Sequence, residues 1–112
     1  MEPIDLGKLV SEMQAAATAV IRQDVATLGG FSAQQLQAIA QQAILVSRGI
    51  ADGTITGETR DFFLDNLKEM VRSFVNVLVG LAIVVVEQTW NAIVGVLWAA
   101  IGKATGLALP IP

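Results

Sequence analysis

The stretch SFVNVLVGLAIVVVEQTWNAIVGVLWAAIG, residues 73–102, is dominated by apolar residues and decides the predicted fold. Glu87 is the only charged residue between Arg72 and Lys103. A helix that is apolar around most of its circumference is buried in protein or in a membrane. The stretch therefore predicts that much of this surface does not face water in the working protein.

The polar and small residues of this stretch share one helical phase. At about 100° per residue they fall on one sector of a helix, with Gly95 at its edge. The alternative, a hairpin that turns at 87–89, would not keep this phase, and residues 87–89 lack the Gly or Pro signal of a reversal. We therefore predict one continuous helix over about 58–102, with Gly80 and Gly95 as the positions where it would bend. The predicted stripe, which lines a lumen or a contact between subunits, consists of Ser73, Asn76, Gly80, Glu87, Asn91 and Gly95.

The length of such a helix bears on the shape of the protein. At 1.5 Å per residue, a helix over 58–102 is about 67 Å long. A compact domain of 100 residues has a radius of gyration of about 13 Å. Since one chain of 112 residues cannot enclose so long a helix, we expect an elongated subunit that assembles with further copies of itself.

Two amphipathic helices are predicted before the long one. Apolar residues recur with helical spacing over residues 4–28, and the double glycine at 29–30 ends this segment. Ser32 and Gln35 form a capping-box pattern, which starts a second helix that runs to about Ile50. The first part of the chain therefore predicts a pair of helices.

The predicted fold class is all-α: two amphipathic helices followed by one long helix with a hydrophobic C-terminal half. Residues 1–57 are expected to form an N-terminal helical hairpin. Residues 58–112 are expected to form the long helix, which contains the hydrophobic segment 73–102 and ends in an apolar tail. Thr56 is the expected N-cap of the long helix.

The composition is unusual for so short a chain. Of its residues, 15% are charged and 54% are hydrophobic, whereas globular proteins have about 25% and about 45–50%. A small domain has a large surface for its volume and normally needs more polar residues. The composition therefore favours a protein whose surface is covered by its own copies, by other proteins or by lipid.

Charge and residue types exclude several functions. The net charge is −3, and no basic cluster suits a nucleic-acid backbone. The chain has no His, Cys or Tyr, and it shows no phosphate-binding loop or nucleophile motif. We therefore expect a protein that is not an enzyme, with no catalytic, cofactor-binding or metal-binding residue and no small-molecule substrate. The N-terminus lacks the basic and apolar regions of a cleavable signal peptide.

Two functions fit these features. In the first, the 73–102 segments of several copies insert into a membrane as a pore, a holin-like protein or a membrane-penetrating component. About 20 residues suffice to span a bilayer, and a charge such as Glu87 must then face other helices or a lumen. The expected membrane or interface anchors are Arg72, Trp90, Trp98 and Lys103.

The alternative is a soluble structural subunit of a phage-like particle, tube or filament. In this case the hydrophobic helix is buried between neighbouring subunits and never meets lipid. Glu87 would then lie at a wet edge and pair with a basic residue. Both functions place the protein at a membrane or within a macromolecular assembly, with copies of itself as partners.

Overall fold

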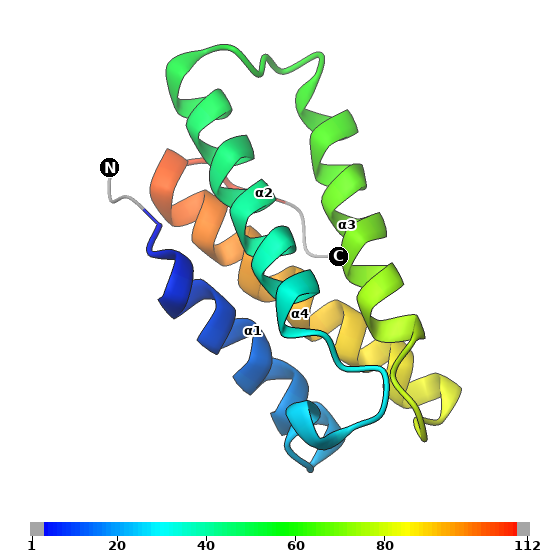
Figure 1. Ribbon diagram of the computed structural model, residues 1–112. Coiled ribbons are helices and arrows are strands. Elements are labelled where there is room, and N and C mark those ends of the chain that lie inside the picture. Colours follow the sequence, from blue (N-terminus) through cyan, green and yellow to red (C-terminus); the bar gives the residue numbers. More distant parts are fainter. Residues whose placement is uncertain (1–3, 110–112) are drawn as a thin grey trace.

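The computed structural model describes residues 4–109, which form four α-helices and one short 3₁₀ helix. The prediction of an all-α fold is confirmed. The four long helices run alternately up and down the molecule, so that neighbours along the chain are antiparallel (Figure 1). The elements are α1 (Leu6–Ile21), η1 (Val25–Thr27), α2 (Ala33–Asp52), α3 (Arg60–Asn76) and α4 (Ile83–Thr105).

The first two helices begin where short polar side chains cap them. Asp5 accepts a hydrogen bond from the backbone N–H of Lys8 at 2.9 Å, and α1 follows. Ser32 accepts one from the backbone N–H of Gln35 at 3.1 Å, so the predicted start of α2 is confirmed. Such caps satisfy N–H groups that lack partners within the helix.

Two predicted helix boundaries are wrong. The first helix does not extend to Leu28, because Arg22 takes up a left-handed conformation (φ 62°) and η1 follows. The N-cap of α3 is Thr59 and not Thr56, since the turn at 56–59 delays the helix until Arg60. The backbone N–H of Arg60 donates to the carbonyl oxygen of Thr56 at 2.8 Å.

The predicted continuous helix over 58–102 is also wrong. The chain leaves α3 after Asn76, reverses through residues 77–82 and enters α4 at Ile83. Gly80 lies in this turn with a φ of +90°, a conformation that L side chains rarely adopt. The helix does continue through 87–89, as predicted.

The turn at 77–82 is held by a loop that precedes it by about fifty residues in the chain. The backbone N–H of Val79 donates to the carbonyl oxygen of Gly29 at 2.9 Å. Gly30 has a φ of +86°, and a Cβ atom there would collide with the backbone carbonyl of Val77. The two backbones therefore approach more closely than a side chain at position 30 would allow.

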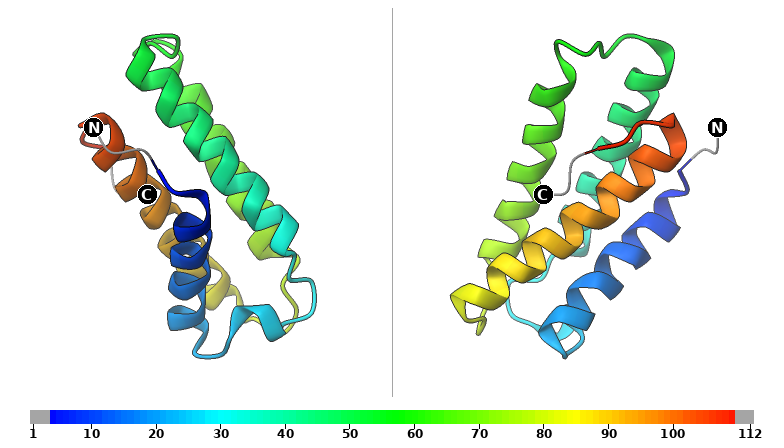
Figure 2. Two further views of the ribbon diagram at one scale, coloured as in Figure 1. Left: turned by 60° about the vertical axis from the view of Figure 1, so that its left-hand side comes forward. Right: turned by 180° about the vertical axis from the view of Figure 1, so that it is seen from behind.

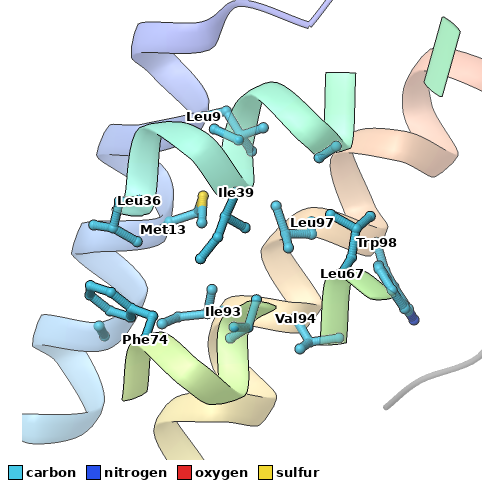
Figure 3. Packing of buried hydrophobic residues seen from close by; sticks show 14 of the residues in the cluster. Leu9, Met13, Leu36, Ile39, Leu67, Phe74, Ile93, Val94, Leu97 and Trp98 are labelled. Atoms are coloured by element: carbon cyan, nitrogen blue, oxygen red, sulfur yellow. The ribbon is translucent and has the colours of Figure 1, made fainter. Parts of the chain in front are cut away.

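The reversal creates a bundle of two layers, with α1 and α4 in one layer and α2 and α3 in the other (Figure 2). Helix α4 contacts each of the other three helices. One hydrophobic core joins side chains from all four helices (Figure 3). The labelled core residues are Leu9, Met13, Leu36, Ile39, Leu67, Phe74, Ile93, Val94, Leu97 and Trp98.

The bundle has the dimensions of a closed domain. Its radius of gyration is 13.7 Å and its principal extents are 41 × 24 × 20 Å, near the value of about 13 Å for a compact domain of 100 residues. The elongated shape expected from a continuous helix is not confirmed. Leu109 of the apolar tail packs against the core, and the remainder of that predicted tail lies outside the described residues.

We expect Gly30→Ala to destabilise the bundle by more than Gly53→Ala does. Both glycines have positive φ, but nothing lies within 4 Å of a Cβ built on Gly53. The control should cost about 1–2 kcal/mol for the left-handed conformation alone. Gly30→Ala should cost a further ~1–3 kcal/mol for the overpacked contact. Urea unfolding measures both values, and equal costs would show that the contact between the loops is dispensable.

Candidate functional site

The α3–α4 turn carries the largest group of solvent-exposed aliphatic side chains in the described structure. Val77, Val79, Ile83 and Val84 have 50%, 64%, 84% and 62% of their surface exposed. They lie within eight consecutive residues at one end of the bundle (Figure 1). We call residues 77–84 the apolar tip. Contiguous exposed apolar surface usually marks a site of contact with a protein or a membrane.

The backbone of the apolar tip is fixed by contacts with the rest of the bundle. Leu78 is buried, and Leu81 is half-buried against the core. The hydrogen bond from Val79 to Gly29 joins the tip to the α1–α2 connection. Leu78 and Leu81 therefore anchor the turn to the core, and the remaining side chains of the tip stay on the outside.

At the end of the bundle that carries the tip, residues 25–31 and 73–86 contain no Asp, Glu, Lys or Arg, and the exposed charges of Arg22 and Asp24 precede them in the α1–α2 connection. The opposite end, where α2 connects to α3 (Figure 1), has a charged connection. Its charged residues include Asp52, Glu58, Arg60 and Asp61. Exposed aliphatic side chains are therefore more concentrated at the tip end, and charged side chains are more frequent at the α2–α3 connection.

The apolar tip is bounded by an ion pair between its two helices. The guanidinium of Arg72 on α3 donates to both carboxylate oxygens of Glu87 on α4, at 2.7 and 3.3 Å. The hydrogen bond from Arg72 lowers the pKa of the Glu87 carboxyl below its ordinary value. Arg72 also stacks 4.4 Å from the ring centre of Trp90, a favourable cation–π contact. The indole N–H of Trp90 donates to the backbone carbonyl of Lys68 at 3.0 Å.

The residues of the predicted stripe do not form one helix face. Ser73 and Asn76 are exposed on α3, whereas Glu87 and Asn91 are exposed on α4. Gly80 lies in the turn that separates the two pairs, and the half-buried Gly95 lies further along α4. The prediction of a single continuous stripe is therefore wrong for this bundle, because the phase of the sequence is interrupted at residues 77–82.

The predicted anchors occupy three different environments. Arg72 and Trp90 contact each other across the α3–α4 pair. Trp98 is buried in the core, with the ammonium of Lys68 6.0 Å from its ring centre. Lys103 is exposed in the last turn of α4, where a positive charge is favourable to the helix dipole. These four residues do not bracket a single helix, since Arg72 lies on α3.

Sequence reasoning missed the apolar tip, because it placed residues 77–84 inside a helix. A signal was nevertheless present. Gly80 lies within the stretch, and glycine readily adopts the positive φ that a tight turn requires. Neither end of the turn has a side-chain cap in the structure, since Val77 and Ala82 occupy the capping positions.

A second surface feature is a groove between the start of α1 and the end of α4, with a volume of about 260 Å³. Two acidic and two basic side chains line it, which are Asp5, Glu12, Lys8 and Lys103. The charges balance, so the groove does not select an ion of either sign. Within residues 4–109, no group of three or more acidic, His or Cys residues is arranged to hold a metal ion.

No family model, curated protein or solved structure matches this chain. Burial of one exposed aliphatic side chain is worth about 1.5–3 kcal/mol. The apolar tip is thus the surface on which contact with another apolar body would release the most free energy.

We expect Glu87→Gln to lower the thermal stability at neutral pH and to have little effect in acid. The pKa of Glu87 is lowered in the folded protein, so the pair stabilises the fold above the unfolded pKa of about 4.3. This contribution is lost as the pH falls through the lower folded pKa. The difference in Tm between the wild type and Glu87→Gln should therefore shrink towards zero below that pH.

The lowered pKa of Asp52, which accepts hydrogen bonds from Thr54, is common to both proteins and cancels in the difference. Arg72→Gln serves as the second half of a double-mutant cycle. A Tm difference that stays constant from neutral to acidic pH would show that the Arg72–Glu87 pair does not carry the effect.

Proposed function

We propose that this chain is a non-enzymatic α-helical protein that associates with membranes and inserts α4 as part of an oligomer. Lipid and further copies of the chain are its partners. The observation that carries the proposal is α4 itself, which is long and apolar enough to cross a membrane. At 23 residues it exceeds the ~20 residues that a transmembrane helix needs.

The exposure of α4 supports this function. In the closed bundle, only 28% of the residues in its most apolar window are buried. The first turn of α4 is the least buried part, with Ile83 and Val84 mostly in water. The remaining apolar surface is available to lipid or to α4 of another copy.

The placement of charge in α4 fits insertion as an oligomer. Glu87 and Lys103 are its only charged residues. Lys103 lies in the last turn, within reach of the membrane surface by the snorkelling of its long side chain. Glu87 would cost at least ~2.5 kcal/mol if it faced lipid at mid-bilayer. It therefore requires a partner, either Arg72 of its own chain or the interior of a helical assembly.

A second function is favoured by a specific observation. The inward face of α4 packs at the centre of the bundle against all three other helices, and Glu87 is paired within the chain. A bundle completed in this way fits the alternative of a soluble structural subunit in a phage-like particle, tube or filament. In this case the apolar tip would be covered by a neighbouring subunit.

Purification without detergent and addition to dye-loaded liposomes separates the two functions. For membrane insertion we expect release of the dye and recovery of the protein in the membrane fraction after an alkaline wash, which removes peripheral proteins. A discrete soluble particle of fixed subunit number, without leakage of dye, would overturn the proposed insertion.

A pair of lysine substitutions controls this test. Ala99 is exposed on α4, so Ala99→Lys should leave the bundle folded. Insertion of the lysine into lipid costs up to ~2.5–3.5 kcal/mol near the bilayer centre, so leakage should fall several-fold. Gln41→Lys adds the same charge to the exposed face of α2 and should leave leakage unchanged. Equal leakage from both variants would exclude α4 as the inserted helix.

A further inference from the structure

We propose that the apolar tip is a wedge by which the closed bundle binds the acyl-chain region of a lipid bilayer. The wedge makes the first, reversible contact with the membrane. It rests on the proposed function in one respect, namely that the partner is lipid. The wedge consists of the exposed side chains of Val77, Val79, Ile83 and Val84, which the fold holds outward at one end of the molecule.

The size and position of the apolar tip favour lipid over a second copy of the chain. A stable protein–protein interface involves about 20–30 residues on each side and about 1,200–2,000 Å² in total. The tip offers a single six-residue turn and the first turn of α4 at the end of a bundle 41 Å long and 20–24 Å across. Two such tips that meet end to end cover few residues. A fluid bilayer closes around a projecting wedge from all sides and has no minimum contact size.

The surrounding charges indicate that hydrocarbon, and not headgroup charge, is recognised. Arg72 and Glu87 are the charged residues that flank the tip on α3 and α4, and Arg22 and Asp24 are those of the adjoining α1–α2 connection. Two are positive and two are negative, so their sum is zero. The whole chain has a net charge of −3, which opposes binding to anionic lipid. The wedge therefore fits a zwitterionic surface such as phosphatidylcholine.

The Arg72–Glu87 pair sets the depth of insertion. Ile83 precedes Glu87 by four residues, which is about 6 Å along the helix at 1.5 Å per residue. This distance lies within the ~5–10 Å by which apolar faces of interfacial helices enter the boundary between headgroups and acyl chains. A wedge of this length inserts until the ion pair reaches the headgroups, and the bundle stays closed.

The test uses two matched substitutions of exposed hydrophobic residues by aspartate. Ile83 is the first residue of α4, and Phe62 lies in the first turn of α3 at the opposite end of the bundle. Their exposed fractions are 84% and 71%. An acidic residue in the first turn of a helix is favourable to the helix dipole, so both variants should remain folded, which circular dichroism verifies.

Binding to phosphatidylcholine vesicles is measured by co-sedimentation at low and high salt. We expect Ile83→Asp to weaken binding at least tenfold and Phe62→Asp to change it less than twofold. Binding of the wild type should not depend on salt and should fall when phosphatidylserine is added. Equal binding by wild type and Ile83→Asp would overturn the proposal, as would binding that requires phosphatidylserine.

A second readout uses the absence of cysteine from the chain. An environment-sensitive fluorophore on Ile83→Cys should shift to shorter wavelength when vesicles are added, whereas the same fluorophore on Phe62→Cys should not. A blue shift that depends on protein concentration and occurs without vesicles would show that a second copy covers the tip, and it would overturn the lipid wedge.

Failure of the wedge and failure of the proposed function are distinguishable. Reversible binding that Ile83→Asp abolishes, without leakage of dye or resistance to alkaline wash, supports the wedge and refutes insertion of α4. Leakage that is equal for wild type and Ile83→Asp supports insertion and refutes the wedge.

Discussion

The close contact between the Gly29–Gly30 loop and the backbone of residues 77–79 is the constraint on which the rest of the structure depends. Within the turn, the residues that follow α3 and precede α4 are Val77 and Ala82, whose side chains cannot accept a capping hydrogen bond. Only Gly80 has the left-handed conformation of a turn residue. The reversal is instead stabilised by the α1–α2 connection. Val79 donates a hydrogen bond to Gly29, and Gly30 allows close approach because it has no Cβ atom.

Because the chain reverses, the apolar residues of α4 can form part of the hydrophobic core of the same molecule. The helix returns along the bundle and supplies core side chains that face α1, α2 and α3. The same reversal brings Arg72 to Glu87 across fifteen residues of sequence. A carboxylate that looked isolated within hydrocarbon is thereby paired at the surface of a single chain. Neither further copies nor lipid are required for this pairing.

The reversal also has a cost, because a tight turn cannot bury all of its side chains. Leu78 and Leu81 turn inward, while Val77, Val79, Ile83 and Val84 remain outside. Their exposure is concentrated in one turn at the end of the bundle opposite the charged α2–α3 connection. This distribution distinguishes the tip from the scattered exposed hydrophobic residues of ordinary surfaces. It is the physical basis for the proposed wedge.

Local patterns in the sequence determined the all-α class, the start of α2 at Ser32 and the helical state of residues 87–89, because capping and helical periodicity act over a few residues. They also identified 73–102 as a predominantly apolar segment with a single charged residue. Helical phase alone did not reveal the break at Gly80, since the polar positions before and after the turn happen to keep one register. Tertiary structure decided that break, because a contact with a loop fifty residues earlier overrides local preference. It therefore also decided the pairing of Glu87 and the exposure of the apolar tip.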